Sequence, residues 1–331
     1  MTGTIAASSG ATFAAMLSIA SAVPSRVVDN AEMCTYIDSS DEWIQQRTGI
    51  AERRWVGEGE TVETLALDAA RSALQRAGIT GSQLSALIVS TVTYFHQTPS
   101  MAAKLAFALD STAAAFDISA ACAGFCYGLA QAESLVRSGA AEYVLVIGVE
   151  ELSRFTNRQD RGTAFLFSDG AGAAVVGPSD VNGIGPVVWG SDGSQADAIN
   201  QTLEWSDALD AGERPYVHMD GRAVFKWATG FISEAARSVL DAAGVQPEEL
   251  DVFIPHQANN RITDAMLRSL KLPEHVVVAR TIKQFGNNSA ASVPMAMDSL
   301  LASGEAKSGQ TALLIGFGAG LVYAGQVVTL P

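Results

Sequence analysis

The sequence predicts an α/β protein made of two related halves, and three observations support this prediction. Residues 69–78 have apolar side chains at helical spacing and lead through Leu84 to an apolar, strand-like run at 87–90. The same unit returns at 235–256, displaced by 166 residues, and nine of the 22 aligned positions are identical. Strand-like and helix-like runs alternate in both halves, which predicts parallel sheets covered by helices. A repeat that spans both a helix and the following strand indicates a duplicated half.

The same displacement makes a prediction about the chain around Cys122. Adding 166 to Cys122 gives position 288, which lies inside 284–292. That segment also follows an apolar run and also precedes a helix rich in small residues. The strand-like residues 143–148 likewise resemble 311–316, with a slip of two residues. We therefore expect the halves to pack about a pseudo-two-fold axis, which would bring corresponding loops together.

The bulk composition limits the classes of function. With 331 residues, 48% of them hydrophobic and 17% charged, the chain is typical of a globular protein with one large domain or two of ordinary size. The net charge of −14 argues against general binding to nucleic acid or to an anionic membrane. An acidic partner would therefore need a local basic patch. No apolar run reaches the length of a membrane span, so we expect no membrane-spanning segment.

The cysteines favour a reducing compartment. Cys34, Cys122 and Cys126 do not make a disulfide framework, and their spacing fits no zinc motif. Cys122 and Cys126 share one helix face, but no nearby histidine completes a metal site. We therefore expect no metal and a cytoplasmic location.

Residues 11–22 resemble a signal peptide, because they are apolar and end in small residues at 20–22. The first basic residue, Arg26, follows that run, so the positively charged region that should precede it is missing. We interpret Phe13–Ala20 as the first strand of the fold instead.

Cys122 is the first candidate for a reactive group. A strand-like start at 116–118 runs into small residues before it, and a helix-like stretch, 128–136, follows it. The unpaired N–H groups and the positive end of a buried helix favour an anion, so we expect a lowered thiol pKa. The alternative is a small buried hydrophobe, since free cysteine is among the most buried residue types.

The duplication favours the reactive interpretation. In two halves related by a pseudo-two-fold axis, Cys122, His256 and Asn287 or Asn288 lie at the ends of corresponding strands or the starts of buried helices. A thiol beside neutral hydrogen-bond donors is a catalytic arrangement. The alternatives are a core histidine at 256 and a simple turn residue after Gly286.

Seven stretches together resemble one family. They are, in chain order, Ser40–Ile44 with Arg47–Ile50, Ala121–Phe125, Asp160–Gly162, Asp169–Ala174, Pro255–Asn259, Gly286–Ser292 and Gly316–Gly320. In this order they resemble β-ketoacyl-acyl-carrier-protein synthase III, the initiating condensing enzyme of type II fatty acid synthesis in the thiolase-like family. The likeness covers essentially the whole chain after the first dozen residues, and 190–199 and 315–323 are most similar to actinobacterial members.

The resemblance implies a thiolase-like fold, in which two duplicated α/β halves form a five-layered αβαβα arrangement with mixed sheets around buried helices. It places the half with the nucleophile at 1–180 and the half with the histidine and asparagine at 181–331. It also implies a homodimer, with the CoA thioester as substrate and no cofactor.

The resemblance further implies an acyltransferase. This enzyme condenses an acyl-CoA primer with malonyl-acyl carrier protein, with loss of CO₂, to give 3-oxoacyl-acyl carrier protein. Cys122 is similar to the nucleophile that holds the acyl group as a thioester. His256 and Asn287 match the pair that binds the malonyl thioester carbonyl, where neutral donors stabilise the enolate left by decarboxylation. The backbone N–H groups of Cys122 and Ala319 match the oxyanion hole.

Five residues match the CoA-binding positions of the family. Trp43 and Arg47 correspond to the adenine end, Arg161 and Gly162 to the opposite wall, and Asn259 to the pantetheine tunnel. An arginine that faces an aromatic ring across a flat purine suits adenine binding. The alternative is that Trp43 is a half-buried helix residue and Arg47 forms a surface ion pair.

The resemblance also supplies the basic patch that an acidic partner needs. Lys226, Arg261 and Arg268 match carrier-protein docking positions, and Arg222 lies one helical turn before Lys226. Acyl carrier proteins are strongly acidic, so local positive charge would steer docking. For each of these residues, a solvated charged face is the alternative.

Two positions depart from many relatives. Thr98 matches a position where phenylalanine in some relatives closes the acyl pocket from across the dimer interface, so we expect a roomier channel for longer or branched primers. Asn288 stands where the family usually has threonine, and we expect it to lie behind the site rather than in it.

Other functions remain as alternatives. A polyketide-priming ketosynthase or an acyltransferase of the same fold is the nearest one, although such acyltransferases often replace the asparagine that Asn287 preserves. A plant-type polyketide synthase shares the Cys-His-Asn set, but the carrier-protein patch and the residues Pro255–Asn259 argue against it. A degradative thiolase needs a second catalytic cysteine near the C-terminus, and no cysteine follows Cys126. A nucleotide-binding protein is an alternative of a different class, but the glycine-rich stretch 316–320 lacks the helix and the downstream acidic residue of a dinucleotide-binding fingerprint. A non-catalytic partner subunit would usually have lost Cys122.

Overall fold

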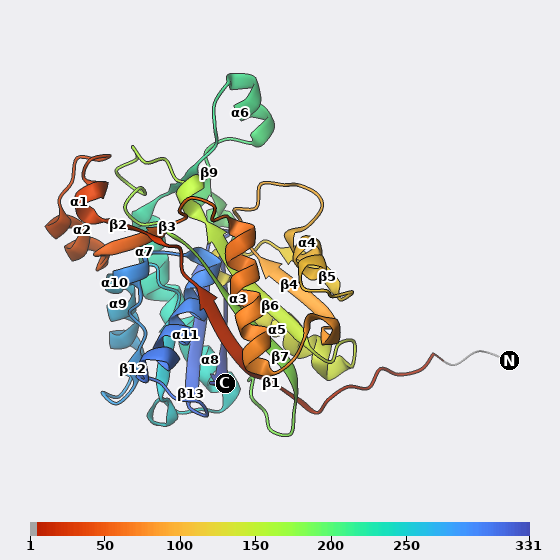
Figure 1. Ribbon diagram of the computed structural model, residues 1–331. Coiled ribbons are helices and arrows are strands. Elements are labelled where there is room, and N and C mark those ends of the chain that lie inside the picture. Colours follow the sequence, from red (N-terminus) through yellow and green to blue (C-terminus); the bar gives the residue numbers. More distant parts are fainter. Residues whose placement is uncertain (1–4) are drawn as a thin grey trace.

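Two five-stranded sheets form the frame of the protein in a computed structural model, which describes residues 5–331 (Figure 1). The first sheet has the order β1 (Phe13–Ala22), β7 (Asp169–Ser179), β6 (Val144–Glu151), β4 (Ala86–Ser90) and β5 (Ala114–Ile118). The second has the order β8 (Val188–Ser191), β14 (Val322–Thr329), β13 (Thr311–Gly318), β11 (Val252–Pro255) and β12 (Val277–Val278). The two orders correspond strand for strand, which confirms the predicted duplication.

Each sheet is mixed rather than parallel throughout. β4 runs parallel to β5 and β6, while β7 runs antiparallel to β6 and β1. The second sheet repeats this pattern around β11 and β14. The expectation of parallel sheets is therefore correct for the direction of four strands of each sheet and wrong for one, β7 in the first sheet and β14 in the second. The reason is that no α-helix separates β6 from β7 or β13 from β14, and parallel neighbours need such a crossover.

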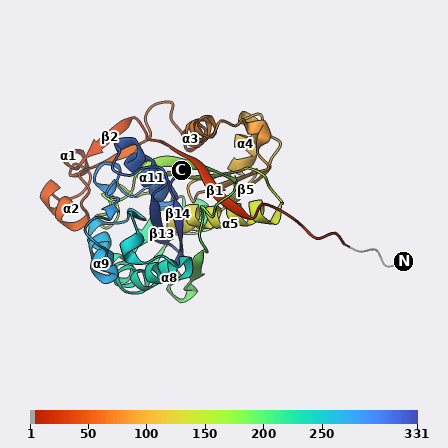
Figure 2. The same cartoon turned by 90° about the horizontal axis from the view of Figure 1, so that it is seen from below.

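Helices add three layers to the two sheets, as Figures 1 and 2 show. α3 (Val62–Ala77) and α4 (Met101–Ala108) pack on the first sheet, and α8 (Ser233–Ala243) and α9 (Asn260–Leu270) share a core with the second. α5 (Gly124–Ser138) and α11 (Ser292–Ser303) contact strands of both sheets, so they form the middle layer. The result is the expected five-layered αβαβα fold.

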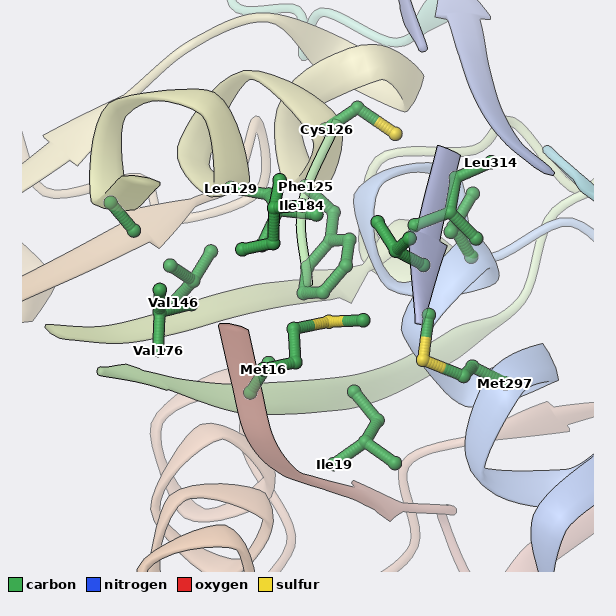
Figure 3. Close-up of a cluster of buried hydrophobic side chains, with 14 of the residues drawn as sticks. Met16, Ile19, Phe125, Cys126, Leu129, Val146, Val176, Ile184, Met297 and Leu314 are labelled. Carbon is green, nitrogen blue, oxygen red and sulfur yellow. The ribbon is translucent and has the colours of Figure 1, made fainter. Parts of the chain in front are cut away.

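The middle layer is held by a buried apolar cluster (Figure 3). It includes residues from both sheets and both central helices: Met16, Ile19, Phe125, Cys126, Leu129, Val146, Val176, Met297 and Leu314. Cys126 is fully buried in this cluster, which gives it a packing role. Burying each of these larger side chains contributes roughly 1.5–3 kcal/mol relative to exposure, so this cluster fixes the two halves on each other.

Shorter elements surround this frame. β2 (Arg26–Asp29), β3 (Glu52–Trp55), α1 (Asn30–Met33) and α2 (Asp41–Thr48) cover one end of it, where α10 (Ile282–Phe285) joins them. β9 (Ile199–Gln201) and β10 (Val217–Met219) form a ribbon from which α6 (Trp205–Ala211) projects. α7 (Gly221–Trp227) follows, and the π-helical turn η5 (Ala228–Ile232) joins it to α8. The 3₁₀ turns are η1 (Gly81–Gln83), η2 (Ala121–Ala123), η3 (Leu152–Arg154), η4 (Gly193–Ala198), η6 (Pro247–Glu249) and η7 (Ser289–Ala291).

The N-terminal interpretation is confirmed, because Phe13–Ala22 is strand β1 and pairs with β7. Within residues 5–331, no helix is both long and apolar enough to cross a membrane. The strands of the first sheet lie between 13 and 179 and those of the second between 188 and 329. The division into units 1–180 and 181–331 stays a prediction.

Candidate active site

Cys122 lies in η2, the tight turn that opens the central helix α5. The residue before it, Ala121, has a positive φ of 43°, and Ser289 has a φ of 46° at the matching place in η7, before α11. The structural counterpart of Cys122 is therefore Ala290, 168 residues further on, and not residue 288 as the constant displacement predicts. The difference arises because the second half has two extra residues between β11 and η7.

Two glycines of β13 let the Cys122 turn rest against the second sheet. A Cβ at Gly316 would lie 2.9 Å from the carbonyl oxygen of Cys122, and one at Gly318 would lie 2.9 Å from its Sγ. Contacts this short do not occur between real side chains, so the positions require glycine. Ala319 follows directly and lines the same cavity as Cys122.

A cavity of about 800 Å³ collects the three residues predicted to carry the chemistry. Cys122 comes from η2, His256 from the residue after β11, and Asn287 from the residues before η7, and all three line this cavity. Its apolar lining includes Phe95, Leu152, Phe155, Phe167, Ile199, Trp205, Val217, Met219, Val224 and Phe317. The cavity therefore has room for an apolar chain beside a thiol, an imidazole and an amide.

His256 is a neutral imidazole in a fixed orientation. It is only 3% exposed, and burial lowers its pKa to about 3. Nδ1 lies 2.6 Å from Ser292 Oγ, and the ring packs edge-on against Phe317 with 5.3 Å between centroids. The other ring nitrogen, Nε2, is left for the cavity.

Asn287 is held by its own neighbours. Its Oδ1 accepts a hydrogen bond from the backbone N–H of Ser289 at 2.9 Å. Its backbone N–H donates to the carbonyl oxygen of Leu166 at 2.9 Å, and its carbonyl oxygen accepts from the N–H of Ser168 at 3.0 Å. Because the amide oxygen is occupied, the amide NH₂ is the group that remains to donate to a ligand.

The thiol of Cys122 differs from its sequence expectation. Part of Cys122 stays open to the cavity, but protein encloses the sulfur, and this burial raises its pKa to about 12. The nearby Ser289 hydroxyl opposes the increase in pKa, while the charge of Glu150 adds to it. The expected lowering by the start of α5 is therefore wrong, because burial is the larger effect.

Four residues near these groups were not foreseen as part of the site. Ser289, Ser292 and Phe317 lie inside two quoted motifs, so their place in the chain was visible although their contacts were not. Glu150 belongs to no quoted motif, and it reaches the site only because β6 packs against η7. A carboxylate inside an apolar strand, 144–151, is the one signal that could have identified it.

The predicted adenine-binding residues come together. The guanidinium carbons of Arg47 and Arg161 lie 5.6 and 5.8 Å from the ring centroid of Trp43, and Phe165 packs edge-on against the same ring. Within the described chain Arg47 forms no ion pair, so the surface ion pair considered as its alternative is absent.

The two remaining CoA-binding candidates sit in loops. Gly162 donates its N–H to Asp160 Oδ1 at 2.8 Å in an exposed turn. Asn259 caps α9 through a hydrogen bond from the N–H of Arg261, so its Oδ1 has a structural partner. The five CoA-binding candidates lie outside the cavity lining, and Ala258 brings the chain beside Asn259 to the cavity wall.

The predicted docking residues form one exposed patch. Arg222 and Lys226 lie on α7, and Arg261 and Arg268 lie on α9. The guanidinium carbon of Arg261 is 5.1 Å from the ring centroid of Phe225, which joins the two helices. Within residues 5–331, none of the four cations forms an ion pair.

The two departures from the family are placed as follows. Thr98 does not line the cavity of its own chain, whereas Gln97 does. Asn288 is 2% exposed and donates from Nδ2 to the carbonyl oxygen of Asp169 at 2.8 Å. Asn288 therefore ties η7 to β7 from behind the cavity. In residues 5–331, no group of three or more His, Cys, Asp or Glu side chains has the arrangement of a metal site.

Known proteins are similar to this chain over nearly its whole length. Residues 116–193 match the model of the family 3-oxoacyl-[acyl-carrier-protein (ACP)] synthase III, and residues 240–330 match its C-terminal model. The β-ketoacyl-[acyl-carrier-protein] synthase III of Streptomyces glaucescens is 56% identical over 97% of this chain and 98% of the relative. The mycobacterial enzyme of that name from Mycolicibacterium paratuberculosis is 50% identical over 99% and 98%.

A solved structure is also similar to this chain in both fold and sequence. The priming β-ketosynthase from the R1128 polyketide biosynthetic pathway superposes with a TM-score of 0.96 and 44% identity, covering 100% of this chain and 99% of that one. The five-layered fold is thus that of the thiolase-like condensing enzymes, a class of acyltransferases. The chain belongs to the β-ketoacyl-[acyl-carrier-protein] synthase III family, with the actinobacterial likeness that the sequence predicts.

Proposed function

We propose that the protein condenses an acyl-CoA primer with malonyl-acyl carrier protein and so initiates type II fatty acid synthesis. The observation that carries this proposal is the meeting of Cys122, His256 and Asn287 on one apolar cavity. More than 100 positions separate Cys122 from His256, so the local sequence does not bring them together. The family relationship supplies the reaction class, and the site supplies the residues.

In the first half-reaction Cys122 takes the acyl group from CoA. Its sulfur attacks the thioester carbonyl, and the N–H groups of Cys122 and Ala319 stabilise the oxyanion. Trp43, with Arg47 and Arg161 over its ring, is the proposed seat of the adenine. Gly162 and Asn259 belong to the same proposed path.

In the second half-reaction the malonyl thioester loses CO₂. An imidazole whose pKa is about 3 stays neutral at physiological pH, so His256 donates a hydrogen bond without carrying charge. The free NH₂ of Asn287 is the second donor to the thioester oxygen. Two donors on this oxygen stabilise the enolate, which then attacks the acyl-Cys122 carbonyl and releases the Cys122 thiolate.

The basic patch on α7 and α9 is the proposed dock for the carrier protein. Its four cations, Arg222, Lys226, Arg261 and Arg268, form no ion pair within residues 5–331 and contrast with the net charge of −14 of the whole chain. Local positive charge attracts an acidic partner even when the net charge would repel it.

A homodimer is part of the proposal. β5 lies at the edge of the first sheet and pairs with β4 on one side. Phe107 on the neighbouring α4 is 86% exposed, and Phe116 on β5 is 36% exposed. Exposed aromatic side chains beside an open sheet edge favour association. Phe107→Arg is expected to shift the protein to a monomer in analytical ultracentrifugation, and an unaltered dimer would count against this interface.

The proposal also includes the length of acyl chain that the site accepts and the cytoplasmic location of the protein. Thr98 lies just before α4, on the side of the proposed interface, and a small residue there leaves room for longer or branched primers. Cys34, Cys122 and Cys126 are all free, as expected for a protein of the reducing cytoplasm.

Priming of polyketide synthesis is the second candidate. It is favoured by the TM-score of 0.96 to the R1128 priming ketosynthase. The reaction on Cys122 is the same in both cases, so the two candidates differ in the carrier protein that delivers malonate. Comparing turnover with a fatty acid carrier protein and a polyketide carrier protein distinguishes them.

The central experiment is intact-mass measurement after incubation with a series of acyl-CoAs. We expect one acyl adduct on the wild-type chain and none on Cys122→Ser, and the acyl-CoA that gives the fullest adduct identifies the primer. Acylation with acetyl-CoA alone would contradict the roomier channel. His256→Ala should still be acylated but should fail to condense. A wild-type chain that never becomes acylated would refute the proposed function.

A further inference from the structure

Glu150 is a buried carboxylate beside the proposed nucleophile that the half-reactions above leave unused. It lies in β6, one residue before the strand ends, and it is fully buried. Its Oε2 accepts hydrogen bonds from Thr93 Oγ1 at 2.7 Å, Val92 N at 3.1 Å and Thr91 Oγ1 at 3.2 Å. Its Oε1 accepts from Ser289 Oγ at 3.0 Å.

Ser289 links this carboxylate to the reacting groups. Ser289 and Cys122 line the same cavity from the adjoining turns η7 and η2, and the backbone N–H of Ser289 donates to Oδ1 of Asn287. Gly148 allows the close approach of η7 to β6, because a Cβ there would lie 2.3 Å from the carbonyl oxygen of Ala290. The packing therefore places thiol, hydroxyl and carboxylate in one row, in which the Ser289 hydroxyl already donates to Glu150.

We propose that Glu150 accepts the thiol proton of Cys122 through the Ser289 hydroxyl during acyl transfer. The proposal rests on the proposed function, since it takes Cys122 as the nucleophile. The Sγ–H proton moves to Ser289 Oγ while the hydroxyl proton moves to Glu150 Oε1. The sulfur bonds to the acyl carbon, and CoA leaves as a thiolate that takes a proton from water. After condensation, the same row returns the proton to the released Cys122 thiolate.

Base strength supports this assignment. Burial raises the pKa of Glu150 to about 7, although its hydrogen bonds from Thr93, Val92 and Ser289 oppose the increase. Burial lowers the pKa of His256 to about 3, so Glu150 is the stronger base. Because the pKa of the Cys122 thiol is about 12, the proton leaves the sulfur together with the attack and not before it.

The groups around Glu150 decide what a pH profile would report. The segment after β4 contributes Thr91, Val92 and Thr93, all of which donate to the carboxylate. Ser289 of η7 and Cys122 of η2 lie on the cavity side. On the neighbouring strand β7, Gly170 lies opposite Glu150, and Asp169 lies opposite Glu151. Cys122 is the ionisable group whose pKa the charge of Glu150 raises. Asp169, with a pKa also raised to about 7 by burial, is the neighbouring carboxylate that needs a control.

The test follows the two half-reactions separately against pH in the full chain. In the wild type, we expect acylation by the primer that gives the fullest adduct to rise with pH through about 7, as Glu150 ionises. In Glu150→Gln, this rise should disappear and acylation near neutral pH should fall about 100-fold, the size of a general-base contribution. Release of CO₂ from malonyl-acyl carrier protein should change by less than about threefold, because His256 and Asn287 carry that step.

A second variant and a control separate the relay from a structural role. Ser289→Ala should reproduce the acylation profile of Glu150→Gln, and its matched position Ala121 shows that alanine fits such a turn. Asp169→Asn removes a buried carboxylate that contacts Ser153 instead, so it should keep the wild-type acylation profile.

The outcomes are distinct. A wild-type profile in both Glu150→Gln and Ser289→Ala would overturn the relay, and so would an equal loss in both half-reactions. If the wild-type chain forms no adduct, the proposed function fails. If it forms the adduct and the variants match it, the relay alone fails.

Discussion

At the scale of single residues, one hydroxyl decides what His256 can do. Ser292 Oγ lies 2.6 Å from Nδ1 of His256 and also accepts a long hydrogen bond of 3.4 Å from the N–H of Gln257. Within residues 5–331, Nδ1 is the one acceptor that the Ser292 hydroxyl proton reaches, so we infer that the hydroxyl donates to Nδ1 and that the ring proton is on Nε2. This tautomer makes His256 a donor toward the cavity, as stabilisation of an enolate requires.

Ser292→Ala tests this arrangement. One lost hydrogen bond is worth about 1 kcal/mol, so we expect CO₂ release from malonyl-acyl carrier protein to slow roughly fivefold while acylation of Cys122 persists. Ser303→Ala, at the other end of α11, is the matched control, since its hydroxyl contacts only Leu300 and Glu305. Equal rates in Ser292→Ala and the wild type would contradict the assigned tautomer.

Asp169 makes a residue-scale prediction about stability and pH. Burial raises its pKa from 3.8 to about 7, so the folded state binds its proton more tightly than the unfolded state. Its contribution to stability is therefore complete below pH 3.8 and is lost as the pH rises through 7. The full effect is on the order of 4 kcal/mol.

Thermal unfolding of Asp169→Asn between pH 4 and pH 8 measures this contribution. We expect a lower Tm at acid pH, because the hydrogen bonds with Ser153 and Val56 are disturbed. We also expect a smaller decline of Tm toward pH 8 than in the wild type. Parallel Tm curves would show that Asp169 is already ionised in the folded protein at pH 4.

At the scale of elements, the active site depends on the close approach of η2 to β13. Gly316 and Gly318 provide the space, and the positive φ of Ala121 turns the chain so that Cys122 faces the cavity. Ser289 has the same backbone conformation in η7. The duplication has thus produced two similar turns that line one cavity, of which one presents a thiol and the other a hydroxyl.

Gly318→Ala tests the importance of this approach. The added Cβ would lie 2.8 Å from the Cβ of Cys122 and 2.9 Å from its Sγ. We expect a loss of about 1–3 kcal/mol in unfolding free energy and at least a tenfold slower acylation. Gly193→Ala is the control, because nothing lies within 4 Å of its added Cβ. If both variants acylate equally fast, the close approach is not needed for the chemistry.

At the scale of the whole molecule, charge is distributed unevenly. The chain carries a net charge of −14, yet the cations of α7 and α9 gather on one face next to the second sheet. Surface charges of this kind affect association more than stability, since exposed charges are well screened.

Charge reversal tests the docking patch. We expect Lys226→Glu combined with Arg268→Glu to raise the KM for malonyl-acyl carrier protein about tenfold and to leave acylation by acyl-CoA unchanged. Added salt should reduce the difference from the wild type. Arg71→Glu, on the exposed face of α3 in the other half, is the control. An equal effect of Arg71→Glu would mean that net charge, and not the patch, controls docking.

The local patterns of the sequence determined a large part of this structure. Apolar spacing and the repeat at 69–90 and 235–256 predicted two corresponding sheets with helices, because helix and strand preferences are properties of short segments. The motifs around Cys122, His256 and Asn287 predicted the residues that meet at one cavity.

Tertiary packing alone decided the rest. The antiparallel direction of β7 and β14 follows from how the chain returns, which no local pattern records. The contact between Glu150 and Ser289 joins residues 139 positions apart. The raised pKa of Cys122 comes from the protein that encloses the sulfur, and this outweighs the helix start that the sequence revealed. Burial and long-range hydrogen bonds arise only when distant segments pack together, so the electrostatics of the site belong to the folded molecule.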